Sequence, residues 1–180
     1  MSDPFDLKST IRTVEGYPIE GVTFRDITSL IETPAAFVRA CDEMTKLCAD
    51  FNPTAIASIE SRGFIFAGPI AKELALPFVL ARKPGKLPND AFSREFDLEY
   101  GSTALEIQKN TALNASDRVV IVDDLIATGG TAIACAQLLN ESFGVVFESI
   151  LVLALIDLPA LGGSALIRET GSESASLIAY

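Results

Sequence analysis

The chain has 180 residues, 49% of them hydrophobic, and a formal net charge of −10 at pH 7. This length and composition predict one folded domain with a sizeable core and exclude a disordered chain. The acidic balance argues against nucleic-acid and anionic-membrane partners, because both require basic surface. No apolar run approaches the roughly 20 residues that cross a bilayer, and the first residues, MSDPFDLKST, lack a signal-peptide pattern. We therefore expect a cytoplasmic protein.

Histidine is absent from the sequence, and the three cysteines, Cys41, Cys48 and Cys135, form no CxxC pair. Histidine-based triads and the usual zinc centres are therefore excluded. Cys41 and Cys48 fall in a helical pattern that is typical of small apolar core residues. Acid–base chemistry must come from Asp, Glu, Lys, Tyr or the substrate.

Helical and β-prone segments alternate along the chain. A short helix is expected over residues 6–12, and residues 22–27 are expected to be extended after the breakers Gly16, Pro18 and Gly21. Further helices are predicted over residues 34–50, 64–74 and 130–140, and strands over residues 54–59, 77–81, 119–122 and 145–155. This alternation is typical of an α/β fold whose parallel sheet is covered by helices on both faces. Such sheets bind ligands at the carboxyl ends of their strands.

The segment from Arg82 to Tyr100 has no clear period and carries Pro84, Gly85 and Pro88. A polar insertion of this length is usually functional or disordered. Four of the 14 Lys and Arg residues fall between positions 82 and 94 of this acidic chain. This concentration favours an anionic ligand, and a solvated basic loop is the alternative. Residues 98–107 are expected to form two short extended pieces around position 101.

The stretch VVIVDDLIATGGTAIA begins at Val119 and combines a buried strand, two acids and a turn of small residues. We expect Asp123 and Asp124 to emerge, solvated, at the carboxyl end of the strand. The turn Ala127–Thr131 exposes backbone N–H groups before a helix, which is typical of an anion site. A phosphorylated sugar offers hydroxyls for the acids and a phosphate for the turn. A plain turn with the two acids as solvated caps is the alternative.

This stretch resembles the phosphoribosyl pyrophosphate (PRPP) signature of type I phosphoribosyltransferases. The segments GVTFRDIT, ESRGF, RKPGKLP and LEYGSTALEIQK resemble, in order over nearly the whole chain, the adenine phosphoribosyltransferase branch of that family. The resemblance implies a central parallel sheet flanked by helices and a homodimer. It also implies a small hood from about residues 1–30 and a flexible flap at about residues 82–100. Residues 159–180 are expected to complete either the sheet edge or the hood.

The resemblance also implies how PRPP is bound. Asp123 and Asp124 would hold the ribose hydroxyls, and Arg62, preceded by a cis peptide, would contact pyrophosphate. The residues implied to hold the 5′-phosphate are Ala127, Thr128, Gly129, Gly130 and Thr131. The flap cations implied to meet pyrophosphate are Arg82, Lys83 and Lys86.

For the base, the resemblance implies that Phe24 stacks on adenine and that Leu125 lies on its other face. Backbone groups of Thr23 and Arg25 would read the base edge. An ordinary core aromatic is the alternative for Phe24, although a planar base suits an aromatic face.

For catalysis, the resemblance implies Glu99 as the proton-transfer group, with Tyr100 beside it and Arg62 stabilising the leaving group. A carboxyl group suits this role in a chain without histidine. Glu60 and Glu106 are alternatives, and an exposed strand residue is the plain interpretation of Glu99.

The reaction implied is adenine plus PRPP giving AMP and pyrophosphate, a step of purine salvage. Mg²⁺ would be the cofactor, held through substrate and water without a direct protein ligand. Two rival functions remain open. One is transfer to another purine, xanthine or guanine. The other is a PRPP-sensing regulator, which would keep the phosphate turn but lose the flap or the base-side acid.

Overall fold

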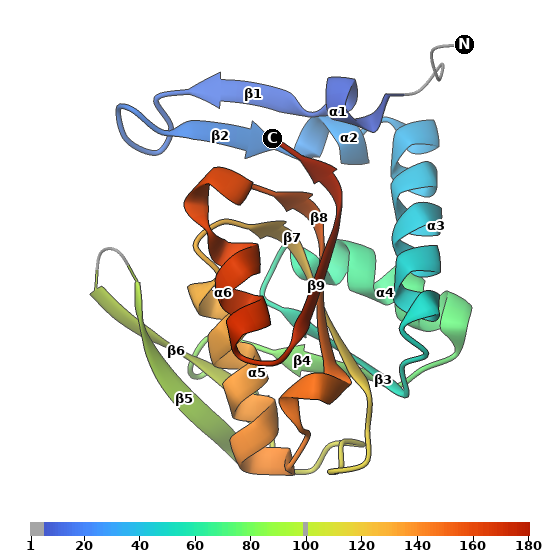
Figure 1. Cartoon of the computed structure of the whole chain (residues 1–180), viewed down its shortest axis with the longest axis vertical. Helices are drawn as coiled ribbons and strands as arrows, with labels where there is room; N and C mark the ends of the chain where they lie inside the picture. Colours follow the sequence, from blue (N-terminus) through green and yellow to red (C-terminus); the bar gives the residue numbers. More distant parts are fainter. Residues whose placement is uncertain (1–5, 99–100) are drawn as a thin grey trace. The chain divides into compact units, whose positions relative to one another are not determined.

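A computed structural model of the protein describes residues 6–98 and 101–180. Contacts divide the chain into two compact units, with the boundary between Glu43 and Met44. The first unit holds two short helices, a two-stranded sheet and the start of a long helix. The second unit holds a five-stranded sheet, three helices and a two-stranded hairpin (Figure 1).

The first unit is built around an antiparallel pair of strands. Helix α1 (Leu7–Thr10) leads into β1 (Arg12–Glu15), which pairs with β2 (Thr23–Asp26) before α2 (Thr28–Ile31) and α3 (Pro34–Asp50). The expected helix over residues 6–12 is therefore confirmed but shorter, because β1 takes its last residue. The expected extended segment is β2, and α3 has the predicted bounds. The strand β1 was not predicted, because its polar residues gain their structure only by pairing with β2.

The sheet of the second unit is parallel throughout, as the sequence predicts. Its strands are β3 (Ala55–Ile59), β4 (Phe78–Ala81), β7 (Val119–Ile126), β8 (Ile150–Asp157) and β9 (Glu173–Ala179). Their order across the sheet is β4-β3-β7-β8-β9. The chain winds outward in one direction from β3 to β4 and in the other from β7 to β9. The switch point between β3 and β7 is where open α/β sheets bind ligands.

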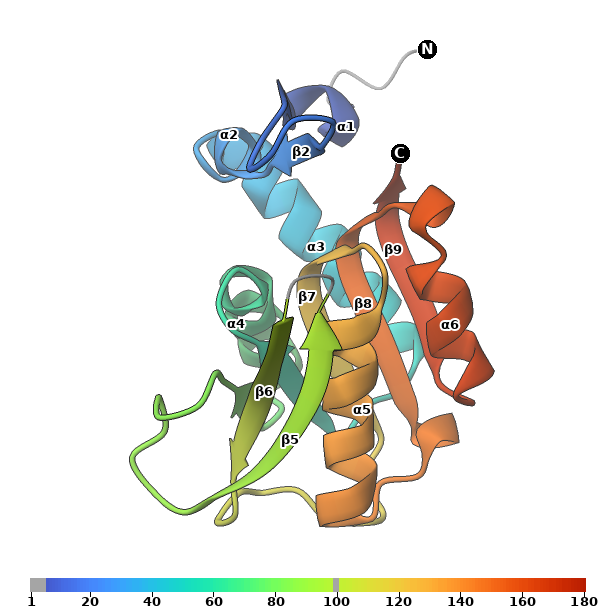
Figure 2. The ribbon, with the colours of Figure 1, turned by 90° about the vertical axis from the view of Figure 1, so that its left-hand side faces the viewer.

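Helices cover both faces of this sheet. Helix α4 (Gly63–Leu74) lies on one face, while α5 (Gly130–Phe143) and α6 (Gly163–Glu169) lie on the other (Figures 1 and 2). Alternate strand residues such as Ala57, Ile121 and Val152 pack with Cys135 and Leu139 of α5 in one core cluster. Burial on both faces explains why the strands are continuous apolar runs.

A hairpin of β5 (Ala91–Leu98) and β6 (Gly101–Gln108) packs beside α5. The two extended pieces expected over residues 98–107 are confirmed in part, because β5 ends at Leu98 and β6 begins at Gly101, but each strand is eight residues long. Phe92 and Phe96 pack against the core cluster, to which Leu105 and Ile107 of β6 belong. Pairing and this apolar contact order a segment that has no clear period of its own.

Two other predicted boundaries are also corrected. Strand β7 runs to Ile126 instead of Val122, because β8 pairs with it as far as Asp157. Strand β8 begins at Ile150, because a short 3₁₀ turn, η1 (Phe147–Ser149), precedes it. The C-terminal segment forms 3₁₀ turn η2 (Pro159–Leu161), α6 and β9, and β9 is the edge strand of the sheet.

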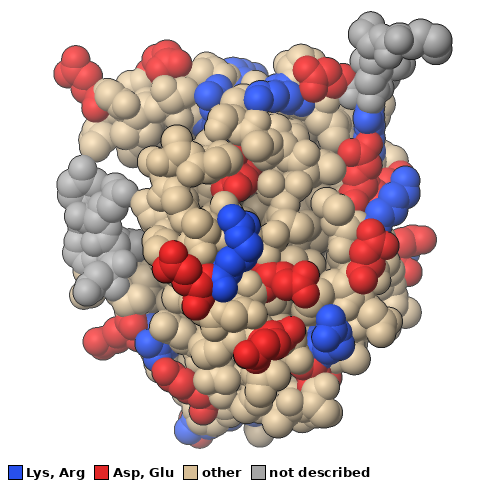
Figure 3. All heavy atoms as spheres, viewed as in Figure 1, with Lys and Arg blue, Asp and Glu red and all other residues tan. Residues whose placement is uncertain are grey.

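The surface drawn in Figure 3 carries Asp and Glu side chains in several places, with Lys and Arg dispersed among them. This distribution suits the net charge of −10. Among the described residues, no helix combines the length and the apolar character that a membrane crossing requires.

Candidate active site

A cavity of about 490 Å³ lies at the carboxyl ends of β3 and β7. It forms because the two strands stop pairing at different points. The pairing of β3 with β7 ends at Ser58 and Val122, whereas β7 pairs with β8 as far as Ile126. The last four residues of β7 therefore have no β3 neighbour on that side. The cavity is lined by Ile59, Glu60, Ser61, Arg62, Lys83, Phe96, Thr103, Ala104, Leu105, Asp123, Asp124, Leu125 and Thr131.

The acid pair, Asp123 and Asp124, lies within β7 on this open side. The side chain of Asp124 is only 7% exposed, and its Oδ2 lies 2.7 Å from Nε of Arg62. The expectation that both acids stay solvated is therefore wrong for Asp124. The acids lie within the strand, and the charge of Asp124 is compensated by Arg62, the N-cap residue of α4.

Asp123 lacks such close compensation. Its Oδ1 accepts a hydrogen bond from the backbone N–H of Asp124 at 2.8 Å. Burial, followed by the charge of Asp124, raises the pKa of Asp123 well above its ordinary value. A carboxylate held in this way gains from any ligand that donates hydrogen bonds to it, as sugar hydroxyls do.

The segment after β3 brings Arg62 to the acid pair. The peptide bond between Glu60 and Ser61 is cis, one residue before the bond that is often cis in the family that the sequence resembles. Glu60 accepts hydrogen bonds from Nε and Nη2 of Arg82 at 3.2 and 3.3 Å, and from the backbone N–H of Lys83 at 3.1 Å. The hydrogen bond from Arg82 is the main cause that lowers the pKa of Glu60. A lowered pKa makes a carboxylate a weaker proton acceptor, which disfavours Glu60 as the proton-transfer group.

The phosphate loop, residues 127–131, joins β7 to α5. Gly129 caps α5 with a φ of 83°, a left-handed conformation that glycine adopts at little cost, and it has no side chain to cap the helix. A second cavity of about 90 Å³ lies here, lined by Asp123 and residues 125–132. The uncapped start of a helix with small side chains fits an anion.

The basic segment, residues 82–86, supplies cations beside the main cavity. Lys83 lines that cavity, whereas Arg82 is engaged by Glu60 and donates from Nη1 to the backbone O of Lys86 at 2.9 Å. Glu106 accepts from the backbone N–H of Gly85 at 3.1 Å. Arg94 forms an ion pair with Glu141 of α5. The structure thus places Lys83 against the cavity and gives Arg82 a second role, holding Glu60.

The predicted base-reading residues lie on β2 of the first unit. Thr23 Oγ1 donates to Glu15 at 2.8 Å, and Arg25 Nη1 donates to Thr13 Oγ1 at 2.6 Å. Phe24 meets Tyr17 edge to face, with ring centroids 5.1 Å apart. These cross-strand contacts fix the backbone on both sides of Phe24.

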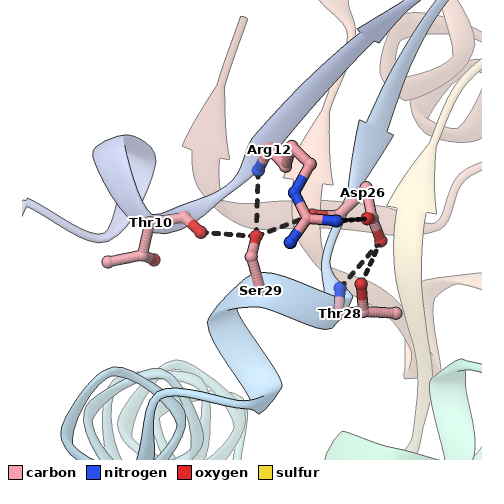
Figure 4. A network of polar contacts seen from close by, with 5 residues as sticks. All are labelled: Thr10, Arg12, Asp26, Thr28 and Ser29. Carbon is pink, nitrogen blue, oxygen red and sulfur yellow. Dashed lines mark hydrogen bonds and ion pairs between the residues drawn. The ribbon is translucent and has the colours of Figure 1, made fainter.

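A polar network fixes the end of the same strand (Figure 4). Asp26 Oδ1 accepts from the N–H and hydroxyl of Thr28 at 3.0 and 2.6 Å, and Oδ2 lies 3.4 Å from Nη1 of Arg12. Ser29 Oγ accepts from the N–H of Arg12 and donates to the O of Thr10. The network ties β2 to β1, α1 and α2, so the strand that carries Phe24 is anchored to three neighbours.

Glu99 and Tyr100, the expected proton-transfer residues, lie outside the described residues. The sequence also failed to indicate Phe96 and Thr103 as cavity residues. They are directly paired in the β5–β6 hairpin. Their place at the cavity depends on the pairing of β5 with β6, and the sequence did not indicate that pairing.

The chain is similar to known proteins over its whole length. The model of the phosphoribosyl transferase domain family matches residues 29–154. The chain belongs to the phosphoribosyltransferase family. A curated adenine phosphoribosyltransferase of Actinobacillus succinogenes is 44% identical over 181 residues, covering 100% of this chain and 98% of that one. The adenine phosphoribosyltransferase of Erythrobacter litoralis is 47% identical, covering 97% and 96%.

A solved structure supports the same family. The APRTase of Giardia lamblia, crystallised with 9-deazaadenine, is similar with a TM-score of 0.90 and 35% identity, covering 97% of this chain and 96% of that one. The type I phosphoribosyltransferase fold implied by the sequence is thereby confirmed. The cavity between β3 and β7 is consequently the candidate active site of a phosphoribosyltransferase.

Proposed function

We propose that the protein is an adenine phosphoribosyltransferase, which converts adenine and PRPP to AMP and pyrophosphate in purine salvage. The observation that carries the proposal is the acid pair followed by the uncapped phosphate loop at the β3–β7 switch point. The names of full-length relatives at 44% and 47% identity support adenine as the base.

PRPP binding follows from the charges in the main cavity. Asp123 and Asp124 accept hydrogen bonds from the ribose hydroxyls, and the phosphate loop binds the 5′-phosphate through backbone N–H groups. Arg62, whose Nε lies 2.7 Å from Oδ2 of Asp124, contacts the pyrophosphate.

The family resemblance assigns recognition of the base to Thr23, Phe24, Arg25 and Leu125. Phe24 stacks on the ring of adenine, while backbone groups of Thr23 and Arg25 bind its edge. The contacts from Glu15 and Thr13 hold those backbone groups in place before the base binds. Holding a recognition strand in advance lowers the ordering cost of binding.

The chemical step exchanges one bond at C1 of the ribose for another. The bond from C1 to the pyrophosphate oxygen breaks with its electron pair, and N9 of adenine supplies the pair for the new bond. Arg62 and Lys83 balance the charge that develops on pyrophosphate, and Arg82 and Lys86 are further candidates. The proton released from adenine passes to Glu99, beside Tyr100. Closure of the flap excludes water, which would otherwise attack PRPP.

The metal expected for this reaction is Mg²⁺. Among the described residues, no three acidic or cysteine side chains converge as a metal site. The carboxylates that line the cavity are those of Glu60, Asp123 and Asp124, and their oxygens are hard ligands of the kind that Mg²⁺ accepts. These residues suit an ion that is coordinated mainly by substrate oxygens and water. Such an ion would supply positive charge at the leaving pyrophosphate.

A cytoplasmic location and a homodimer are also proposed. Three buried free cysteines suit a reducing compartment. Burial raises the pKa of Cys135 and of Cys48 to about 12, so both thiols stay protonated and unreactive. The homodimer rests on the family resemblance, and sedimentation of the purified protein would test it.

The test of the function is turnover of labelled PRPP with adenine, guanine, hypoxanthine and xanthine in parallel. We expect AMP from adenine and little product from the other bases. Preferred use of guanine or xanthine would contradict adenine as the substrate but support phosphoribosyl transfer as the reaction. Binding of PRPP without product from any base would favour a regulator and contradict the proposal.

A further inference from the structure

The turn after β8 lies directly against the phosphate loop. The chain passes from η2 into Gly162, which has a φ of 76°, and then into Gly163 at the start of α6. The backbone N–H of Gly163 donates to the O of Ala127 at 3.1 Å, and the N–H of Leu158 donates to the O of Ile126 at 3.0 Å. Two consecutive carbonyls leading into the phosphate loop are therefore held by residues that follow β8.

The contact at Gly163 is backbone against backbone. A Cβ added at Gly163 would lie 2.3 Å from the O of Ala127, 2.6 Å from the N of Gly129 and 2.8 Å from the carbonyl C of Thr128. A Cβ added at Gly129 would in turn lie 2.8 Å from the O of Gly163. No flexible side chain takes part, so any side chain at position 163 must displace the loop itself.

This contact bears on anion binding through peptide geometry. In a trans peptide the C=O and the following N–H point in opposite directions. A carbonyl of Ala127 directed at Gly163 therefore directs the N–H of Thr128 away from it. An anion needs the N–H groups of the loop to face it and the carbonyl oxygens to face elsewhere. The hydrogen bond from Gly163 enforces this orientation at Ala127.

We propose that Gly163 is a positioning residue for the 5′-phosphate, because its backbone contacts residues 127–129 and fixes the conformation of the phosphate loop. The proposal rests on the proposed function, and it extends the site to the C-terminal segment. Gly163 contacts the loop through its backbone. Its effect should therefore be limited to ligands that carry the 5′-phosphate.

The experiment compares AMP with adenosine on Gly163→Ala by isothermal titration. We expect AMP and ribose 5-phosphate to bind about 10- to 100-fold more weakly, because a misplacement of about 1 Å costs that much. Adenosine affinity should stay within about twofold of wild type. In turnover, the KM for PRPP should rise by the same factor as the AMP dissociation constant, and the KM for adenine should not.

Gly171→Ala is the matched control. Gly171 follows the other end of α6 with a φ of 96°, and a Cβ there would lie 3.4 Å from Cβ of Phe147, away from the phosphate loop. We expect this variant to lose thermal stability but keep its AMP affinity. An AMP loss in Gly171→Ala equal to that in Gly163→Ala would overturn the proposal, as would wild-type AMP affinity in folded Gly163→Ala.

A milder variant covers the case in which Gly163→Ala does not fold. A Cβ at Gly162 meets nothing within 4 Å but disfavours the φ of 76°. Gly162→Ala should therefore shift the turn without a clash and weaken AMP about two- to tenfold. Unchanged AMP affinity in that variant would contradict the proposal.

The two proposals fail differently. Wild-type protein that binds AMP but transfers to no base contradicts the proposed function alone. Wild-type activity with an AMP affinity that Gly163→Ala leaves unchanged contradicts the positioning role alone.

Discussion

The signature segment, residues 119–131, and the basic segment, residues 82–86, border one cavity but are held in different ways. The signature segment is fixed by main-chain contacts with β8 and Gly163, and its Asp124 is buried. In the basic segment Lys83 and Lys86 are exposed, and the side chains of Glu60 and Glu106 hold the backbone. The signature segment, held by its main chain, suits a ribose phosphate, whose shape is constant. The basic segment, held by side chains, suits pyrophosphate, which must leave after each turnover.

The comparison predicts its largest effect at Asp124. Asp124→Asn should lower kcat/KM for PRPP about 10- to 100-fold, because a hydrogen bond to a charged group is lost. Steady-state kinetics with PRPP as the varied substrate would measure this. Asp50→Asn, at the exposed end of α3, removes the same charge and should change nothing. Unchanged PRPP kinetics in Asp124→Asn would refute the ribose-holding role.

The next effect tests how tightly the signature segment is packed. A Cβ at Gly63 would lie 2.6 Å from the O of Val122, 2.7 Å from Oγ of Ser58 and 3.0 Å from Cα of Asp123. Gly63→Ala should therefore destabilise the protein by about 1–3 kcal/mol through overpacking. Thermal unfolding would measure the loss.

Gly68 in the same helix provides the control for that variant. A Cβ at Gly68 meets nothing within 4 Å beyond its own chain neighbours. Gly68→Ala should change the free energy of unfolding by less than about 1 kcal/mol, because the better helix propensity of alanine is opposed by the contact of its Cβ with the ring of Pro69. Equal effects of the two substitutions would show that the packing between α4 and β7 is looser than described.

A smaller effect is expected in the basic segment. Lys83→Ala should raise the KM for PRPP about two- to fivefold, since an exposed charge contributes up to about 1 kcal/mol. The effect should shrink as the salt concentration rises, whereas that of Asp124→Asn should persist. Lys72→Ala, at an exposed position of α4, is the charge control. If Lys83→Ala weakened the use of PRPP as much as Asp124→Asn does, and independently of salt, the proposed difference between the two segments would be contradicted.

The smallest expected effect is the pH dependence of the stability that Asp123→Asn adds to the protein. The raised pKa of Asp123 means that the folded protein holds this proton more tightly than the unfolded chain. Stability is therefore lost as pH rises from the ordinary Asp value through the folded one. Ligand-free Asp123→Asn should be more stable than wild type at pH 7, and the difference should shrink toward pH 4. Melting temperatures across this range would measure it, and a difference independent of pH would contradict the cause.

The sequence predicted what local patterns control. The bounds of α3, the parallel sheet and the positions of Asp123, Asp124 and the phosphate loop follow from apolar periodicity and from small residues at a turn. The family resemblance supplied the reaction. These features are readable because each is encoded within a stretch of about one helix or strand.

Only the tertiary structure decided how far each strand continues and what lies against the phosphate loop. Strand β7 extends past the acid pair because β8 pairs with it, and β5 is ordered by β6 and by core contacts of Phe92 and Phe96. Arg62 reaches Asp124 from the start of α4, and Gly163 reaches Ala127 from the start of α6. A sequence pattern records a residue's preference, but these contacts join residues that only folding brings together.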